Sequence, residues 1–100
     1  MNMVYTISEI ADLIVPIAKR YGVASVWLFG SYAKGEATGK SDVDLLIDGG
    51  KIRTLFQLTA FRLDCEEALR KSVDIVTVGS QDHDFVRSIR SDEVMLYDAA

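Results

Sequence analysis

The sequence predicts an α/β (or α+β) domain in which helices flank a small mixed β-sheet. Short runs of β-branched and aromatic residues alternate with longer stretches of helical periodicity, and glycines stand at the joins. With 100 residues the chain has the size of one domain, which we place at residues 1–100. Its 49% hydrophobic and 26% charged residues, with a mean hydropathy of +0.15, exclude an intrinsically disordered chain.

The first predicted element is a helix that follows a capping-box pattern. Thr6 and Glu9 have the spacing at which each side chain satisfies the other's backbone amide. Apolar residues then recur at helical spacing as far as Tyr21, and Gly22 is a natural stop. Pro16 lies inside this pattern and lacks an amide hydrogen, so we expect a kink or a restart there.

A buried strand is predicted at residues 23–29, because this run is too short for a helix and rich in β-formers. Trp27 and Phe29 alternate along it, which places them in the core rather than on a base-stacking surface. Gly30 ends the strand, and residues 31–41 are typical of a short helical turn followed by a loop.

The second half of the chain continues the alternation of strands and helices. We expect a strand at 43–47, a long helix at 52–71, a strand at 72–78, a helix at 80–90 and a short strand at 94–97. One side of the long helix carries Leu55, Leu58, Phe61, Cys65 and Leu69.

Composition also limits the partners and the compartment. The net charge of −4 leaves few basic residues to neutralise phosphates, so we do not expect DNA or RNA as the main partner. No apolar run approaches the roughly 20 residues of a membrane span, and no export signal is apparent. The single cysteine, Cys65, cannot form an internal disulfide, which favours a reducing cytoplasm.

Two aspartates stand where the second strand begins. Asp42 and Asp44 are two residues apart, so on a strand they project from the same face. Close carboxylates repel one another, and a divalent cation removes the conflict. Mg²⁺ is the natural choice because it prefers hard oxygen ligands completed by phosphates and water. The alternative is a solvated turn before a strand.

A third carboxylate is available on another predicted strand. Asp74 lies between Val73 and Ile75, where an acid is costly unless it is paired or binds a metal. If this strand neighbours residues 43–47, three carboxylates could hold two ions about 3.5–4 Å apart, as in displacement at phosphorus. The alternative is a structural ion pair with Arg70.

The turn after the first strand is a candidate phosphate site. Gly30 and Ser31 open a helical turn whose free amides, with the Ser31 hydroxyl, would bind a nucleotide's phosphates. Lys34 follows close by, although a surface lysine is the simpler interpretation. We favour local packing for Tyr32, and a capped helix start over a metal site for His83.

Together, Gly30-Ser31, the ten residues that follow, Asp42-x-Asp44 and the later Asp74 resemble the DNA polymerase β-type nucleotidyltransferase superfamily. The run from Leu28 to Gly35 is most similar to its minimal nucleotidyltransferase (MNT) branch. The resemblance implies that the three aspartates bind two Mg²⁺ ions, and that Asp74 acts as the general base or assists it. It also implies that Gly30 and Ser31 contact the triphosphate of ATP. Lys34 stands where many relatives have arginine.

The resemblance also implies a reaction and a partner. The family transfers a nucleoside monophosphate from a nucleotide to a hydroxyl, and minimal members are commonly paired with a HEPN-domain ribonuclease toxin. As antitoxins they transfer AMP from ATP to a toxin tyrosine. The 100 residues leave no room for an acceptor-binding domain, so we expect a second protein or a homodimer to complete the cleft. The competing hypothesis is a binding module that neutralises its partner by docking and has a vestigial nucleotide site.

Overall fold

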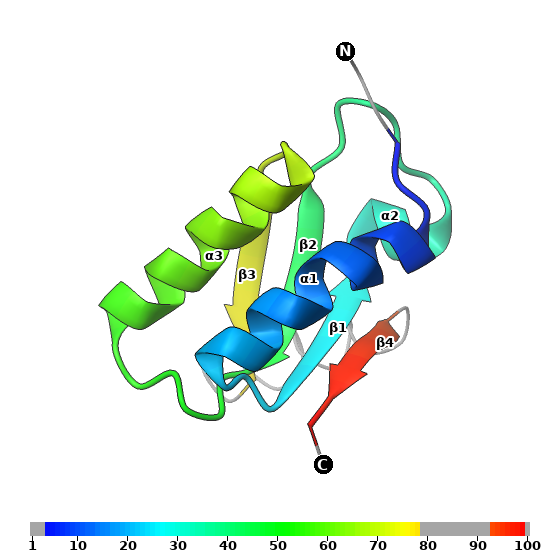
Figure 1. The fold of residues 1–100 in the computed structure, drawn as a ribbon. Helices are drawn as coiled ribbons and strands as arrows, with labels where there is room; N and C mark the ends of the chain where they lie inside the picture. Colours follow the sequence, from blue (N-terminus) through cyan, green and yellow to red (C-terminus); the bar gives the residue numbers. More distant parts are fainter. Residues whose placement is uncertain (1–3, 79–92, 100) are drawn as a thin grey trace.

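The computed structural model describes residues 4–78 and 93–99, which form a four-stranded mixed sheet and three helices (Figure 1). The strand order is β3-β2-β1-β4. β1 pairs antiparallel with β2 and with β4, whereas β2 and β3 are parallel, so the predicted mixed sheet is confirmed. The strands are β1 (Ser25–Phe29), β2 (Val43–Asp48), β3 (Val73–Thr77) and β4 (Val94–Asp98).

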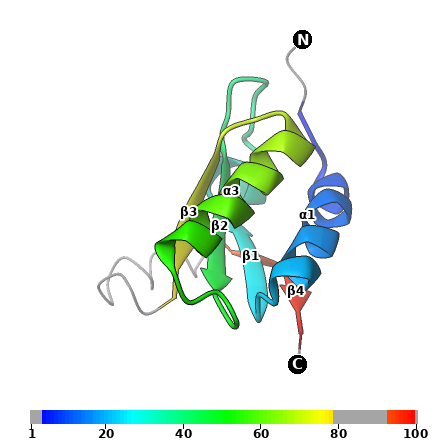
Figure 2. The same cartoon turned by 60° about the vertical axis from the view of Figure 1, so that its left-hand side comes forward.

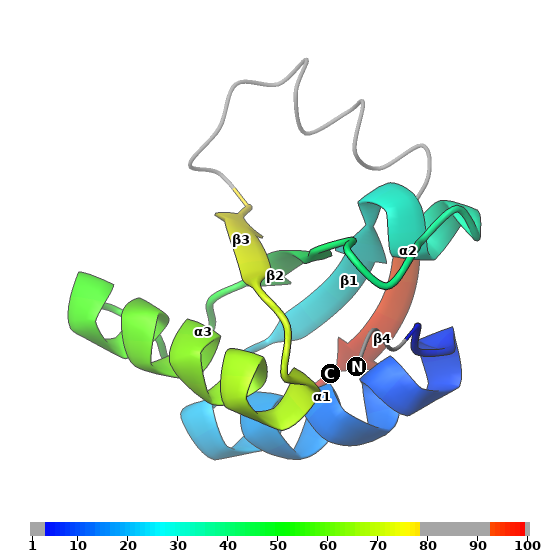
Figure 3. The same cartoon turned by 90° about the horizontal axis from the view of Figure 1, so that it is seen from above.

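The two long helices cover one face of the sheet. α1 (Ile7–Tyr21) and α3 (Leu55–Leu69) lie side by side on that face, as Figures 2 and 3 show. The short α2 (Gly30–Lys34) begins where β1 ends, away from this layer. Of the three described helices, α1 and α3 thus cover one face of the sheet, and α2 lies where β1 ends, close to the start of β2 and the candidate site.

The main core lies between the helical layer and the sheet. Its helical members are Ile10, Ile14, Ile17 and Ala18 of α1 and Phe61, Cys65 and Leu69 of α3. Alternate residues of the strands face them, because side chains of a strand point in turn to opposite sides. These strand residues are Val26, Leu28, Val43, Leu45, Ile47 and Val73.

α1 begins with the predicted capping box. The Glu9 amide donates to Thr6 Oγ1 over 3.0 Å, and the Thr6 amide donates to Glu9 Oε1 over 2.8 Å. Gly22 ends the helix in the left-handed conformation. The expected restart at Pro16 is wrong, since α1 is a single helix from Ile7 to Tyr21. Buried residues lie on both sides of the proline and hold both halves against one core.

α3 is shorter than predicted, covering Leu55–Leu69 rather than 52–71. Its start is fixed by a second capping box, in which the Gln57 amide donates to Thr54 Oγ1 and Gln57 Oε1 accepts from the Thr54 amide. Leu55, predicted to share one side of the helix with Phe61, Cys65 and Leu69, is 77% exposed in the first turn. At the other end Arg70 adopts a left-handed conformation (φ 56°) and its amide donates to the Glu66 carbonyl.

The expectation that Trp27 and Phe29 belong to the core is also wrong. Both are half-buried, and the core positions of β1 are Val26 and Leu28. The alternation was read correctly, but a period of two does not say which face the helices cover. β1 starts at Ser25 rather than at residue 23.

Of the elements predicted after α3, the structure describes the two strands but not the helix between them. β4 confirms the expected strand near 94–97. β3 extends over Val73–Thr77, one residue shorter at each end than predicted. The predicted helix at 80–90, with His83, lies outside the described residues. In the part of the chain that the structure describes, no helix is long and apolar enough to cross a membrane.

Candidate active site

Asp44 and Asp74 occupy neighbouring positions on adjacent strands. Asp44 of β2 is the register partner of Asp74 on β3 and of Phe29 on β1, so the three residues form a row across the sheet. Paired residues face the same side, and the row lies on the face opposite the main core because Val43 and Leu45 point into that core. The condition on which a third carboxylate would join the site, that the strand of Asp74 neighbours the strand at 43–47, is met.

The two carboxylates interact directly, and the pKa of Asp44 shows the effect. Burial raises this pKa, and the charge of Asp74, a hydrogen bond with Asp74 and the charge of Asp42 raise it further, to about 6. Asp44 is half-buried, whereas Asp42 and Asp74 are exposed. Among the described residues no ion pair joins Asp74 to Arg70, so the structural alternative for Asp74 is not found.

Gly30 brings the start of α2 against Asp44. Its φ of 73° lies in the left-handed region, which favours glycine. A Cβ placed on Gly30 would overlap the Oδ2 atom of Asp44, whereas one placed on Gly35 (φ 74°) would meet nothing within 4 Å. The absence of a side chain at position 30 therefore lets the carboxylate lie beside the first residue of α2.

α2 presents the other predicted site residues. Phe29 precedes α2 in an extended conformation. Its side chain does not cap the helix, so it accepts no hydrogen bond from the first backbone amides of α2. Ser31 is half-buried and Lys34 is exposed in the last turn. Tyr32 is buried in the core, as predicted, and its hydroxyl finds no hydrogen-bond partner among residues 4–78 and 93–99.

Asp42 ends a compact loop that joins α2 to β2. Within this loop the Thr38 amide donates to Ser41 Oγ (2.9 Å) and the Ser41 amide donates to the Thr38 carbonyl (3.0 Å). Lys71, between α3 and β3, donates from Nζ to the carbonyls of Gly39 (2.7 Å) and Ser41 (3.4 Å). Sequence reasoning missed Lys71, because a lysine after a helix reads as a surface residue.

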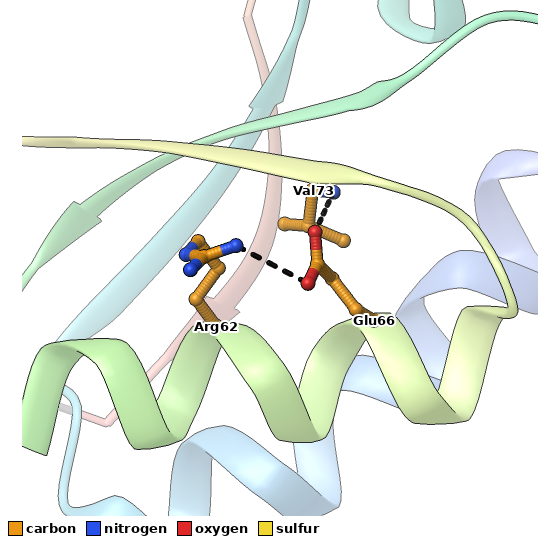
Figure 4. Close-up of polar contacts among 3 residues, drawn as sticks. All are labelled: Arg62, Glu66 and Val73. Carbon is orange, nitrogen blue, oxygen red and sulfur yellow. Dashed lines mark hydrogen bonds and ion pairs between the residues drawn. The ribbon is translucent and has the colours of Figure 1, made fainter.

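The start of β3, and with it Asp74, is anchored to α3 by Glu66. Glu66 Oε2 accepts the Val73 amide at 3.0 Å, and Oε1 accepts from Arg62 Nη1 at 3.2 Å (Figure 4). Arg62 and Glu66 are one helical turn apart, so their ion pair orients the carboxylate toward the strand. Sequence reasoning missed this contact as well.

The carboxylates of Asp42, Asp44 and Asp74 are chemically suited to bind a hard divalent cation. Three carboxylates supply the oxygen ligands that Mg²⁺ prefers, and the charges of Asp74 and Asp42 raise the pKa of Asp44, as expected where carboxylates lie close together. In residues 4–78 and 93–99 no three His, Cys, Asp or Glu side chains are already gathered around one point. The carboxylates thus form a coupled Asp44–Asp74 pair, with Asp42 as a weaker neighbour.

A separate apolar surface lies on the outer side of α3. Leu55, Phe56 and Leu63 are 77%, 90% and 51% exposed. With Thr59 and Ala60 they line a shallow hollow of about 340 Å³. Exposed apolar groups of this kind commonly mark contact with another chain. Cys65, on the opposite side of α3, is buried, and burial raises the pKa of its thiol to about 12.

Known proteins resemble this chain in sequence. Residues 12–100 match the family model described as "Polymerase beta, Nucleotidyltransferase". The chain is 39% identical over 74 residues to the "Putative protein adenylyltransferase MJ0435" of Methanocaldococcus jannaschii, covering 74% of this chain and 80% of that protein. It is 34% identical over 79 residues to the protein adenylyltransferase MntA of Thermococcus cleftensis, covering 75% and 80%.

Solved structures share the fold. A toxin–antitoxin crystal structure with AMP-PNP aligns with a TM-score of 0.78 at 19% identity, over 89% of this chain and 73% of that one. A complex of a tri-AMPylated Shewanella oneidensis HEPN toxin with its MNT antitoxin aligns with a TM-score of 0.73 at 16% identity, over 94% and 74%. With its sequence match over 89 of 100 positions, residues 12–100, the chain belongs to the polymerase beta nucleotidyltransferase family.

Proposed function

We propose that this chain is a Mg²⁺-dependent protein adenylyltransferase that moves AMP from ATP to a hydroxyl of a partner protein. The observation that carries the proposal is the coupled Asp44–Asp74 pair lying against the Gly30 start of α2. This arrangement puts metal-binding oxygens beside backbone amides that suit phosphate. The names of the two relatives in Methanocaldococcus and Thermococcus favour a protein as the acceptor.

Each site residue has a role in the proposed reaction. Gly30, Ser31 and Lys34 bind the triphosphate, and the aspartates at 42, 44 and 74 hold the metal. Bound Mg²⁺ supplies positive charge against the triphosphate and the leaving group.

The acceptor hydroxyl transfers its proton to Asp74, whose exposed carboxylate is accessible to another protein. The hydroxyl oxygen bonds to the α-phosphorus as the bond to the bridging oxygen breaks, and pyrophosphate leaves.

The proposed acceptor is a tyrosine of a HEPN-type ribonuclease toxin, and the chain acts as its antitoxin. The solved complex of an AMPylated HEPN toxin with an MNT antitoxin supports this choice of partner. The exposed apolar surface on α3 supports association with a second chain, whether that toxin or another copy. We take residues 1–100 as one nucleotidyltransferase domain and place the reaction in the cytoplasm, where ATP and reduced thiols are abundant.

Transfer of label from α-labelled ATP tests the proposal. The purified chain is incubated with Mg²⁺ and a HEPN-domain protein from the adjacent gene, beside an Asp42→Asn/Asp44→Asn double variant. Label should appear on the partner, and it should be lost in the double variant and when EDTA removes the metal. Co-purification of the two proteins without any label would contradict the enzymatic proposal and favour the docking module.

A further inference from the structure

Lys71 connects the two segments that carry the site's exposed carboxylates. Its ammonium bonds to the Gly39 and Ser41 carbonyls, immediately before Asp42. Lys71 itself stands three residues before Asp74. The bond from the Val43 amide to the Ser72 carbonyl (3.0 Å) continues this junction into the parallel pairing of β2 and β3. One side chain thus spans the gap between the Asp42 segment and the Asp74 segment.

The loop before Asp42 is bonded through Lys71 to the segment between α3 and β3. We refer to residues 38–42 as the Asp42 loop. Its bonds between Thr38, Lys40 and Ser41 close the loop on itself and fix its shape. They do not fix where the loop lies relative to the sheet. The bonds from Lys71, which is half-buried and lies between α3 and β3, attach the loop to the body of the fold.

We propose that Lys71 is a positioning residue that holds the Asp42 loop beside the Asp44–Asp74 pair, so that Asp42 can join these carboxylates in binding one divalent cation. This inference rests on the proposed function for the identity of the site. An exposed carboxylate on an untethered loop must be ordered when a cation binds, and that ordering weakens the affinity. When a group that hydrogen-bonds and orients a metal ligand is removed, the affinity for the metal typically falls by about 10- to 100-fold.

Two substitutions at position 71 separate tethering from general stability. Lys71→Met keeps the length and the apolar stem but removes the donors, whereas Lys71→Arg can still donate to both carbonyls. Lys40→Met is the matched control, because Lys40 is an exposed lysine in the same loop and its bond to Thr38 Oγ1 is donated by the backbone amide. Thermal unfolding of all three variants verifies that they fold.

The first readout is hydrogen exchange, in metal-free protein, at the Val43 amide, which follows the Asp42 loop and donates to the Ser72 carbonyl. Exchange should be at least about fivefold faster in Lys71→Met, and near the wild-type rate in Lys71→Arg and Lys40→Met. Unchanged exchange in Lys71→Met would overturn the proposal, whatever the outcome of any activity assay.

The second readout is Mn²⁺ binding to the protein without nucleotide. The dissociation constant should rise roughly tenfold in Lys71→Met and recover in Lys71→Arg. Faster exchange with unaltered Mn²⁺ affinity would also overturn the positioning role. If the wild-type protein binds no Mn²⁺, the metal dependence of the proposed function fails, and exchange alone then decides whether Lys71 holds the loop.

Discussion

Gly30 is the residue at which the start of α2, the proposed phosphate-binding turn, meets the carboxylate of Asp44. Two separate constraints act on it, the left-handed φ of 73° and the contact with Asp44 Oδ2. Gly35 shares the first constraint (φ 74°) but has open space where a Cβ would lie. The two glycines therefore allow the cost of the close approach to be measured apart from the cost of the backbone conformation.

Gly30→Ala should destabilise the fold more than Gly35→Ala. The backbone strain costs each variant about 1 kcal/mol or somewhat more, and the overlap with Asp44 should add about 1–3 kcal/mol at position 30. Urea unfolding of both variants measures the difference. In a Gly30→Ala/Asp44→Ala background the extra cost should disappear. Equal losses for Gly30→Ala and Gly35→Ala would show that the Asp44 contact is unimportant.

At the scale of elements, the parallel pairing of β2 and β3 places two acids side by side. The folded-state pKa of Asp44 lies well above its ordinary value, near 6, so the folded protein holds this proton more tightly than the unfolded chain does. The resulting stabilisation is complete below the ordinary pKa of an aspartate and is lost as the pH rises through about 6. Above that pH the ionised pair opposes folding.

Asp44→Asn should consequently stabilise the metal-free protein at pH 7.5, by about 1–2 kcal/mol once solvent screening is allowed for. The gain should shrink toward zero as the pH falls to about 4, because asparagine resembles the protonated acid. Urea midpoints at several pH values test this, with Asp12→Asn on the exposed side of α1 as the control. A gain independent of pH would contradict the coupling.

Local signals predicted the elements well, and tertiary contacts account for the errors. The Thr6 capping box and the β2 and β3 runs are encoded within a few residues, so they could be predicted from the sequence. Which face of β1 meets the helices depends on the whole layer, and this explains the misplacement of Trp27 and Phe29. The first turn of α3 extends past the core, so Leu55 is exposed, and the helical pattern alone does not show where along the helix the core ends.

The candidate site divides in the same way. The proximity of the aspartates at 42, 44 and 74 could be predicted from their spacing in the sequence, once the strands that carry Asp44 and Asp74 are taken to be neighbours. Lys71 and Glu66 act across more distant contacts, from the α3–β3 junction to the Asp42 loop and to the Val73 amide. No short pattern marks a lysine whose partners are backbone carbonyls 30 and 32 residues away.

At the scale of the whole molecule, the central claim is that the chain acts on its partner by turnover. The sheet carries one half-buried and two exposed carboxylates close to the start of α2 at Gly30. The family to which the chain belongs is one of nucleotidyltransferases. A catalyst modifies many partner molecules in succession, whereas a docking module neutralises them one for one. The amount of chain needed for neutralisation therefore distinguishes the two.

The most direct measurement is the ribonuclease activity of the HEPN partner, after incubation with decreasing amounts of this chain and then separation from it. With ATP and Mg²⁺, an amount of chain well below equimolar should abolish the activity. Without ATP, or with Asp42→Asn/Asp44→Asn, the activity should persist. Neutralisation that needs one chain per partner and is indifferent to ATP would contradict the account.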